Sequence, residues 1–242
     1  MFLNPYFSSN NHQFQFTRQQ ASHFAKKVAG DFNPIHDEDN KRFCVPGDLL
    51  FAVLLKKEGI SQNMKFKFSG MVGDLTPLHI EHMAGKESAL VDESGKEYLH
   101  MNRDGEVSHN PALIEHVITS YARFSGMNFP HLLVPLMKDN NVMINCERPL
   151  VMYESMELSF THLDLTHPEV KLSHTTFDVD GKRGLVTLHF NFINDDQIVG
   201  QGTKRLVVCG LRPYDDNAID KLVDRFHELK NAFQARIAGQ AA

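Results

Sequence analysis

The 242-residue sequence has only three cysteines, no long apolar run and no excess of basic residues. Cys44, Cys146 and Cys209 cannot all pair with one another, and none stands in a metal-ligand spacing such as Cys-x-x-Cys. We therefore expect free, buried thiols in a reducing cytoplasm. The net charge of −5 argues against a nucleic-acid binder, which normally carries a basic balance or stripe.

Membrane features are also missing from the sequence. The longest apolar run, residues 49–55, is far shorter than the ~20 residues that span a bilayer. Residues 1–5 lack the basic stretch and apolar run of a signal peptide. Because 42% of the residues are hydrophobic, the chain can bury a core, and we expect a soluble, cytoplasmic protein with no membrane partner.

The first part of the chain has clear helix signals. Thr17 and Gln20 form a Thr-x-x-Gln capping box, and Gly30 is placed to end the helix that follows. Residues 49–55 are apolar on all sides and are followed by helix formers and Gly59, which favours a helix buried on nearly every face. Strand-like runs then follow at 64–68, 75–83, 87–91 and 98–102.

The second part repeats this order without repeating the sequence. Asn110 and Pro111 are the N-cap and first residue of a predicted helix that ends at Gly126. Strand candidates lie at 142–145, 156–163, 170–177, 185–193 and 197–209, and a long amphipathic helix covers 216–237. We predict an α+β protein with similar halves at 1–105 and 106–212, and a C-terminal helix within 213–242 that packs on its own domain or joins a homodimer.

The segment Gly30-Asp31-Phe32-Asn33-Pro34-Ile35-His36 is the most informative for function. Pro34 forces Asn33 into an extended conformation, so Asp31 and His36 project from a rigid turn. A carboxylate and an imidazole that converge on one water form a general acid–base pair, suited to adding water to a double bond or removing it. The alternative is a plain Asp-Asn-Pro turn with His36 exposed beside it.

Residues 17–55 resemble the MaoC-like, R-specific enoyl-CoA hydratases, whose hot-dog fold wraps a sheet around one long buried helix. Residues 24–31 match the family's lead-in to the Gly-Asp-x-Asn-Pro-x-His motif, and residues 45–50 match the start of its central helix. The resemblance implies a double hot-dog, with two antiparallel sheets each wrapped around a buried helix. The half at 1–105 carries the motif and the half at 106–212 supports it.

The resemblance also implies a reaction, the hydration of a trans-2-enoyl thioester of coenzyme A or of acyl carrier protein in fatty acid metabolism. Asp31 and His36 would be the catalytic pair, Asn33 would orient the loop, and the Gly47 amide would bind the thioester carbonyl, with no metal and no cofactor. An N–H at the start of a buried helix favours developing negative charge.

The chain departs from this family at the central helix. Pro46-Gly47-Asp48 stands where the family usually has His-Gly-Met, and Ala29-Gly30-Asp31 stands for Ser-Gly-Asp. Pro46 has no N–H to donate, and Asp48 adds negative charge beside a developing oxyanion. Both favour an alternative, a hot-dog module that binds acyl thioesters without turning them over. A thioesterase would share the fold but would not need the motif.

Three weaker signals lie outside this motif. His79, Glu81 and His82 could suggest a metal site, but strand alternation places His82 on the opposite face, which excludes three convergent ligands. Cys44 could be a nucleophile, but it has no histidine partner at a suggestive spacing, so we interpret it as a small buried apolar group. Residues 125–131 look faintly like a second copy of the motif, which we discount because Met127 stands in place of the acid.

Basic residues flank the motif. They could meet the phosphates of coenzyme A or an acidic carrier protein, or they could be a solvated helix face and loop. These residues are Lys26, Lys27, Lys41 and Arg42.

Overall fold

The computed structural model describes residues 2–10, 12–127 and 129–240. The description leaves out Met1, Asn11, Asn128 and residues 241–242. Each of the predicted units 1–105, 106–212 and 213–242 contains at least one of these residues. The helices and turns are η1 (Asn4–Tyr6), α1 (Arg18–Phe24), η2 (Ala25–Ala29), η3 (Pro34–His36), α2 (Gly47–Glu58), α3 (Pro111–Gly126), η4 (Phe129–Leu133), α4 (Val134–Asp139) and α5 (Asp216–Gln240). The strands are β1 (Ser8–Asn10), β2 (Gln13–Gln15), β3 (Ile60–Phe68), β4 (Leu78–His82), β5 (Glu87–Asp92), β6 (Glu97–Ser108), β7 (Val142–Met143), β8 (Val151–Phe160), β9 (Glu169–Asp180), β10 (Arg183–Asn194), β11 (Gln197–Cys209) and β12 (Arg212–Pro213).

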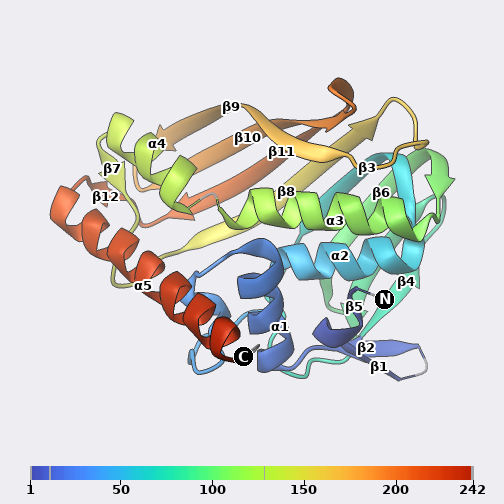
Figure 1. The fold of residues 1–242 in the computed structure, drawn as a ribbon, viewed down its shortest axis with the longest axis horizontal. Coiled ribbons are helices and arrows are strands. Elements are labelled where there is room, and N and C mark those ends of the chain that lie inside the picture. Colours follow the sequence, from blue (N-terminus) through green and yellow to red (C-terminus); the bar gives the residue numbers. More distant parts are fainter. Residues whose placement is uncertain (1, 11, 128, 241–242) are drawn as a thin grey trace.

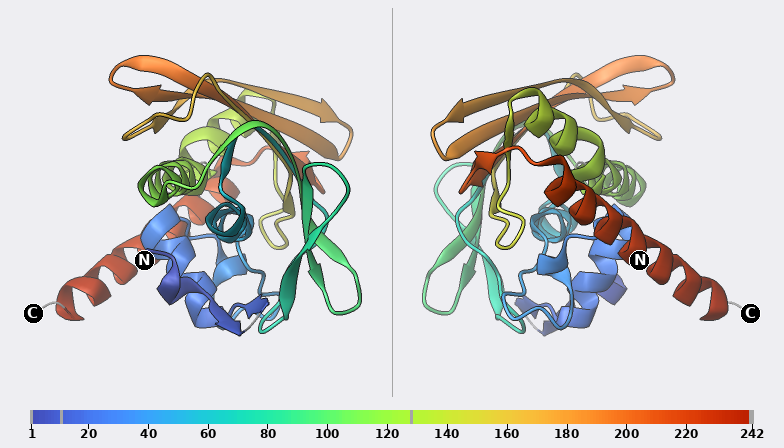
Figure 2. Two further views of the ribbon diagram at one scale, coloured as in Figure 1. Left: turned by 90° about the vertical axis from the view of Figure 1, so that its right-hand side faces the viewer. Right: turned by 90° about the vertical axis from the view of Figure 1, so that its left-hand side faces the viewer.

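The main sheet has the strand order β1-β2-β4-β5-β6-β3-β8-β11-β10-β9 and is antiparallel throughout. Both halves use one topology: a helix precedes a strand that pairs with the last strand of its half, β3 with β6 and β8 with β11. The sheet curves around α2 and α3, which lie side by side (Figures 1 and 2). This is the α+β double hot-dog that the resemblance implies.

The two half-sheets are not separate. Strand β3 of the first half pairs with β8 of the second, with Asn63 opposite Ser159 and Lys67 opposite Ser155. An antiparallel edge left open would expose unpaired N–H and C=O groups, and joining the half-sheets removes that edge. The predicted pair of sheets is therefore one continuous ten-stranded sheet.

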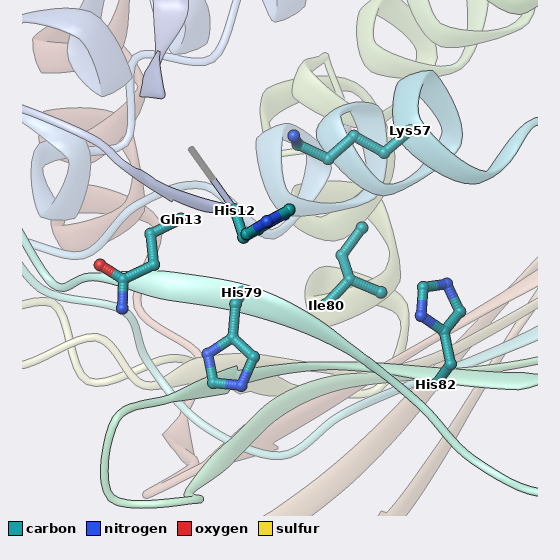
Figure 3. A pocket seen from close by; sticks show the side chains of 6 residues that line it. All are labelled: His12, Gln13, Lys57, His79, Ile80 and His82. Atoms are coloured by element: carbon teal, nitrogen blue, oxygen red, sulfur yellow. The ribbon is translucent and has the colours of Figure 1, made fainter. Parts of the chain in front are cut away.

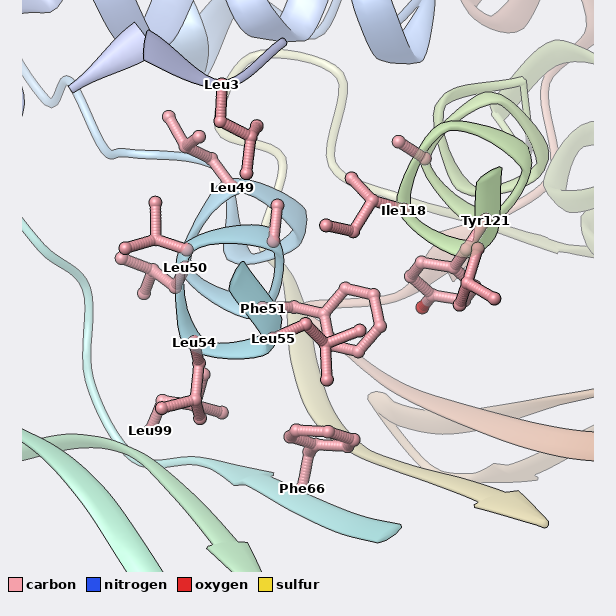
Figure 4. Packing of buried hydrophobic residues seen from close by; sticks show 14 of the residues in the cluster. Leu3, Leu49, Leu50, Phe51, Leu54, Leu55, Phe66, Leu99, Ile118 and Tyr121 are labelled. Atoms are coloured by element: carbon pink, nitrogen blue, oxygen red, sulfur yellow. The ribbon is translucent and has the colours of Figure 1, made fainter. Parts of the chain in front are cut away.

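Helix α2 fills the concave side of the sheet, as its all-round apolar pattern predicts. Every residue from Asp48 to Leu55 is buried, and Gly59 ends the helix with a φ of 83°. Figure 4 shows its side chains between the sheet residues Phe66 and Leu99 and the α3 residues Ile118 and Tyr121. Phe51 joins the halves directly, since its ring lies edge-on 5.1 Å from that of Tyr121.

The C-terminal end of α2 is held by a polar cluster around Glu58. This buried carboxylate accepts hydrogen bonds from Ser88 at 3.2 Å and Arg103 at 3.3 Å, and lies 3.0 Å from Nε2 of His82. Arg103 also donates to the Glu58 carbonyl oxygen at 2.6 Å, which caps the helix. The division between the predicted halves, at residues 105 and 106, falls within β6, which continues to Ser108.

Several local expectations change in the structure. Strand β4 begins at Leu78, three positions after the predicted start, because Leu75 has a φ of 54° and turns the chain. The strand expected at 142–145 shrinks to β7, which pairs only with β12 in a separate small sheet. The β10–β11 hairpin turns at Asp195 and Asp196, whose φ values of 48° and 60° are typical of a tight two-residue turn.

Helix α5 packs on its own chain. Its buried residues Phe226 and Phe233 contact Phe32, and Phe129 also packs against this cluster. The C-terminal helix therefore lies against the segment that carries the motif. None of the helices in the described ranges is long and apolar enough to cross a membrane.

Candidate functional site

The motif loop, residues 30–36, is positioned by the turns on both sides of it. The Thr17 side chain accepts from the Gln20 N–H and the Gln20 side chain accepts from the Thr17 N–H, so the predicted capping box is present. Helix α1 then runs into the π-helical turn η2, which ends at Gly30 with a φ of 69°. A glycine adopts this left-handed geometry without steric cost, and it delivers Asp31 into the loop.

Asn33 makes two hydrogen bonds within the loop. Its N–H donates to Oδ1 of Asp31 at 2.8 Å, and its side-chain oxygen accepts from the Ile35 N–H at 3.1 Å. Its ψ of 123° is extended, in keeping with the Pro34 that follows, and Pro34 opens the short turn η3. The loop conformation is thus fixed by Asn33 and Pro34.

Asp31 and His36 lie together, with Oδ2 3.6 Å from Nε2. On the other side of the ring, Nδ1 of His36 is 2.7 Å from the Cys44 carbonyl oxygen. A carbonyl oxygen can only accept, so Nδ1 carries a proton and Nε2 is the ring nitrogen that faces the Asp31 carboxyl. Two atoms at this separation can both reach a single water at ~2.8 Å.

Burial raises the pKa of Asp31 above its ordinary value, and the nearby Asp48 charge acts in the same direction. His36, the Asn33 N–H and Lys204 oppose this shift. A raised pKa suits a carboxyl that must both take up and return a proton near neutral pH.

Gly47 is the first residue of α2, with Pro46 as the N-cap. The Pro46 carbonyl accepts from the N–H of Leu49 at 3.0 Å and of Leu50 at 3.3 Å. Within the described ranges, the Gly47 N–H has no hydrogen-bond acceptor. It is therefore a free donor at the positive end of a buried helix, the position where an oxyanion is favoured.

The second half contributes a buried lysine that the sequence analysis missed. Lys204 of β11 is only 4% exposed. Its Nζ donates to Oγ of Ser125 at the end of α3 and lies 3.9 Å from Oδ1 of Asp48. Desolvation lowers the pKa of Lys204, while the charges of Asp48 and Asp31 raise it. A cation from the second half thus faces the start of α2.

Two tyrosines complete this buried cluster. The Lys204 ammonium lies 4.2 Å from the centre of the Tyr153 ring and 5.7 Å from that of Tyr121, and the two hydroxyls are hydrogen-bonded. Burial raises the pKa of both tyrosines well above its ordinary value, so both are neutral hydroxyls. Phe68 stacks on the Tyr153 ring at 3.9 Å, and Gly47 touches both rings, since a Cβ there would lie 3.0 Å from Tyr153 and 3.2 Å from Phe68.

Helix α3 approaches the motif loop closely at Gly126. A Cβ at this position would lie 2.1 Å from the Ala29 carbonyl oxygen and 3.0 Å from the Asp31 nitrogen. Residues 125–131, discounted as a decayed motif copy, therefore carry two residues that build the site, Ser125 and Gly126. Asn128 of this segment lies outside the described residues.

Two of the residues that flank the motif, Cys44 and Lys26, have local roles. Burial raises the pKa of the Cys44 thiol to about 11, so the thiol is neutral and a poor nucleophile. Lys26 is paired with Asp37 at 2.8 Å.

A separate hollow lies away from the motif. It is lined by His12, Gln13, Lys57, His79, Ile80 and His82, from the turn before β2, from β2, from α2 and from β4 (Figure 3). It contains neither Asp31 nor His36. Among the described residues, no cluster of three or more histidine, cysteine, aspartate or glutamate side chains could hold a metal ion.

Comparison with known proteins gives a family. The model of the family described as "Protein of unknown function (DUF3581)" matches residues 1–217. The chain belongs to this family. No curated protein matches the sequence significantly.

Several solved structures are similar in fold. An acyl-CoA thioesterase II from Mycobacterium marinum is 10% identical, with 89% of this chain and 99% of that chain covered and a TM-score of 0.42. A hot-dog protein of unknown function from Alicyclobacillus acidocaldarius is 8% identical, with 86% and 98% covered and a TM-score of 0.42. A MaoC-like dehydratase is 9% identical, with 83% and 97% covered and a TM-score of 0.41. These identities are too low to bring a function to this chain.

Proposed function

We propose that this protein is an enoyl-thioester hydratase of the R-specific type, which acts on a trans-2-enoyl thioester of coenzyme A or of an acyl carrier protein. The observation that carries the proposal is the approach of Asp31 Oδ2 to within 3.6 Å of His36 Nε2, on a ring whose Nδ1 is bound to a carbonyl. Both groups can reach one water, and the raised pKa of Asp31 suits a group that takes up and returns a proton.

In the proposed reaction, the oxygen of that water adds to C3 of the enoyl chain. A water proton passes to the Asp31 and His36 pair, and the pair returns a proton to C2. The intermediate enolate carries negative charge on the thioester oxygen, which the free Gly47 N–H and the start of α2 would stabilise. The reverse reaction removes water by the same steps.

Lys204 supports the enzyme against the alternative. The sequence raised a specific objection, the negative charge of Asp48 where the family has methionine. The Lys204 ammonium lies 3.9 Å from this carboxylate and offsets its negative charge inside the site. Pro46 accepts hydrogen bonds through its carbonyl and leaves the Gly47 N–H as the donor.

The second candidate is a module that binds acyl thioesters without turning them over. It is favoured by the internal pairing of the polar groups next to Gly47, namely Lys204 with Ser125 and Tyr121 with Tyr153. Such pairs could serve only to line a pocket.

One assay separates these candidates from each other and from a thioesterase. Purified protein is mixed with crotonyl-CoA, and the absorbance of the conjugated enoyl thioester and the free thiol are followed together. A hydratase lowers the absorbance, releases no thiol and forms R-3-hydroxybutyryl-CoA. A thioesterase releases thiol. Binding of crotonyl-CoA with neither a fall in absorbance nor a release of thiol would identify a binding module without turnover.

A further inference from the structure

The buried lysine contributed by the second half lies close to Asp48 without forming a hydrogen bond to it. Lys204 lies on β11 among inward-facing residues, and burying an ammonium costs several kcal/mol unless it is paired. Its nearest anion is Asp48, but the separation of 3.9 Å is longer than a hydrogen bond. Oδ1 of Asp48 is buried and has no hydrogen-bond partner among the described residues. The two side chains are thus close enough for their charges to attract, but they do not form a hydrogen bond.

The position of Lys204 is fixed from several sides. Ser125 of α3 accepts from its Nζ, and the ring of Tyr153 from β8 lies 4.2 Å away. Phe68 stacks on the Tyr153 ring at an interplanar angle of 23°, so that face of the ring is filled and Lys204 lies over the opposite face. Gly47 lies at the shared edge of the two rings. Lys204 and Gly47 therefore both lie close to the Tyr153 ring.

The charged and titratable groups around Lys204 come from every element packed against it. Asp48 belongs to α2 and Asp31 to the motif loop, while Tyr121 of α3 and Tyr153 of β8 are neutral hydroxyls. Two carboxylates therefore share one ammonium. Without it, Asp48 would be an unpaired buried anion one residue away from Gly47, whose N–H has no acceptor in the described ranges.

We propose that Lys204 is a positioning residue of the thioester site, which draws the Asp48 carboxylate aside so that the Gly47 N–H stays free for a thioester carbonyl. The site is then composite: the first half supplies the acid–base pair and the amide, and the second half supplies the charge that keeps the amide free. This inference rests on the proposed thioester site, but it concerns binding of the carbonyl as well as turnover.

The test is a double-mutant cycle with Lys204→Gln, Asp48→Asn and the double variant. Glutamine removes the charge and keeps an N–H donor, on a side chain one bond shorter than that of lysine. Lys204→Met is the second variant, to be used if the Lys204→Gln protein does not fold. Lys65→Met is the matched control, since Lys65 is exposed and paired with Glu157 on the outer side.

Two readouts are taken for each variant. Calorimetry with butyryl-CoA, a saturated thioester that cannot be hydrated, measures carbonyl binding. We expect Lys204→Gln to weaken binding about tenfold or more, the double variant to recover most of this loss, and Lys65→Met to bind as the parent protein does. In crotonyl-CoA hydration, the acid limb of the kcat/KM profile should move to higher pH in Lys204→Gln, because the ammonium no longer stabilises ionised Asp31.

The outcomes are separable. If the parent protein binds butyryl-CoA but does not hydrate crotonyl-CoA, the hydratase proposal fails and the binding cycle alone decides the role of Lys204. Unchanged binding in Lys204→Gln overturns the inference, as does a double variant that binds as weakly as Lys204→Gln, since a merely structural lysine gives no rescue. A parent protein that binds neither thioester overturns both.

Discussion

The ring of Phe32 lies edge-on against that of Phe226, with centroids 5.6 Å apart. Phe32 stands between Asp31 and Asn33 in the motif, and Phe226 lies on the C-terminal helix α5. Phe32 therefore anchors the loop to α5, while Asp31 beside it approaches His36. The anchoring of the loop depends on residues almost two hundred positions away in the chain.

Phe226→Ala should loosen this anchor. Removing a buried phenylalanine side chain costs about 3 kcal/mol of unfolding free energy, and the freed Phe32 should also lower hydration turnover. Chemical denaturation and the crotonyl-CoA assay measure the two effects. Ile237→Ala on the same helix is the control, because Ile237 is exposed and should tolerate the change. Equal stability of the two variants would show that α5 does not hold the loop.

Gly126→Ala should push α3 away from the motif loop. The new methyl group would meet the Ala29 carbonyl at 2.1 Å, and backbone atoms cannot give way as a flexible side chain can. We expect a loss of about 2 kcal/mol in unfolding free energy and a clear loss of activity. Gly73→Ala is the matched control, since its nearest neighbour, Oγ1 of Thr76, is 3.7 Å away. A variant as stable and active as Gly73→Ala would contradict the close approach.

Asp31→Asn should stabilise the protein at neutral pH. Because the folded pKa of Asp31 is raised, the carboxyl contributes stability that is complete below its unfolded pKa and is lost as the pH rises through the folded value. Asparagine never ionises and can still accept from the Asn33 N–H. The Tm advantage of Asp31→Asn over the parent protein should thus be larger at about pH 7 than at about pH 4. An advantage that is constant or larger in acid would mean that Asp31 is not destabilised by burial.

The elements that the sequence predicted well are those fixed by neighbouring residues. The capping box of Thr17 and Gln20, the turn at Gly30 and the Asn110-Pro111 helix start all depend on contacts within a few positions. The burial of α2 follows from an apolar pattern without a polar face. The catalytic roles of Asp31 and His36 and the limits of the two halves remain predictions.

The missed features depend on contacts between the halves. The residues near Lys204 in the sequence do not predict its contacts with Asp48 and Ser125, which are 79 or more positions away. One signal was available: in the predicted strand 197–209, alternation places Lys204 on the same face as Gly202 and Leu206, which are buried. A lysine on the inward face of a strand is unusual enough to indicate a buried partner. The joining of the half-sheets at β3 and β8 had no comparable local signal.

The central claim is that Asp31 and His36 act together on one water, and the most direct measurement is the turnover of crotonyl-CoA by Asp31→Asn and His36→Ala. Each variant should lose about 100-fold or more in kcat, the usual effect of removing a positioned acid or base, while its affinity for butyryl-CoA changes little. A parent protein that hydrates crotonyl-CoA while both variants keep its full turnover would remove the motif from the reaction.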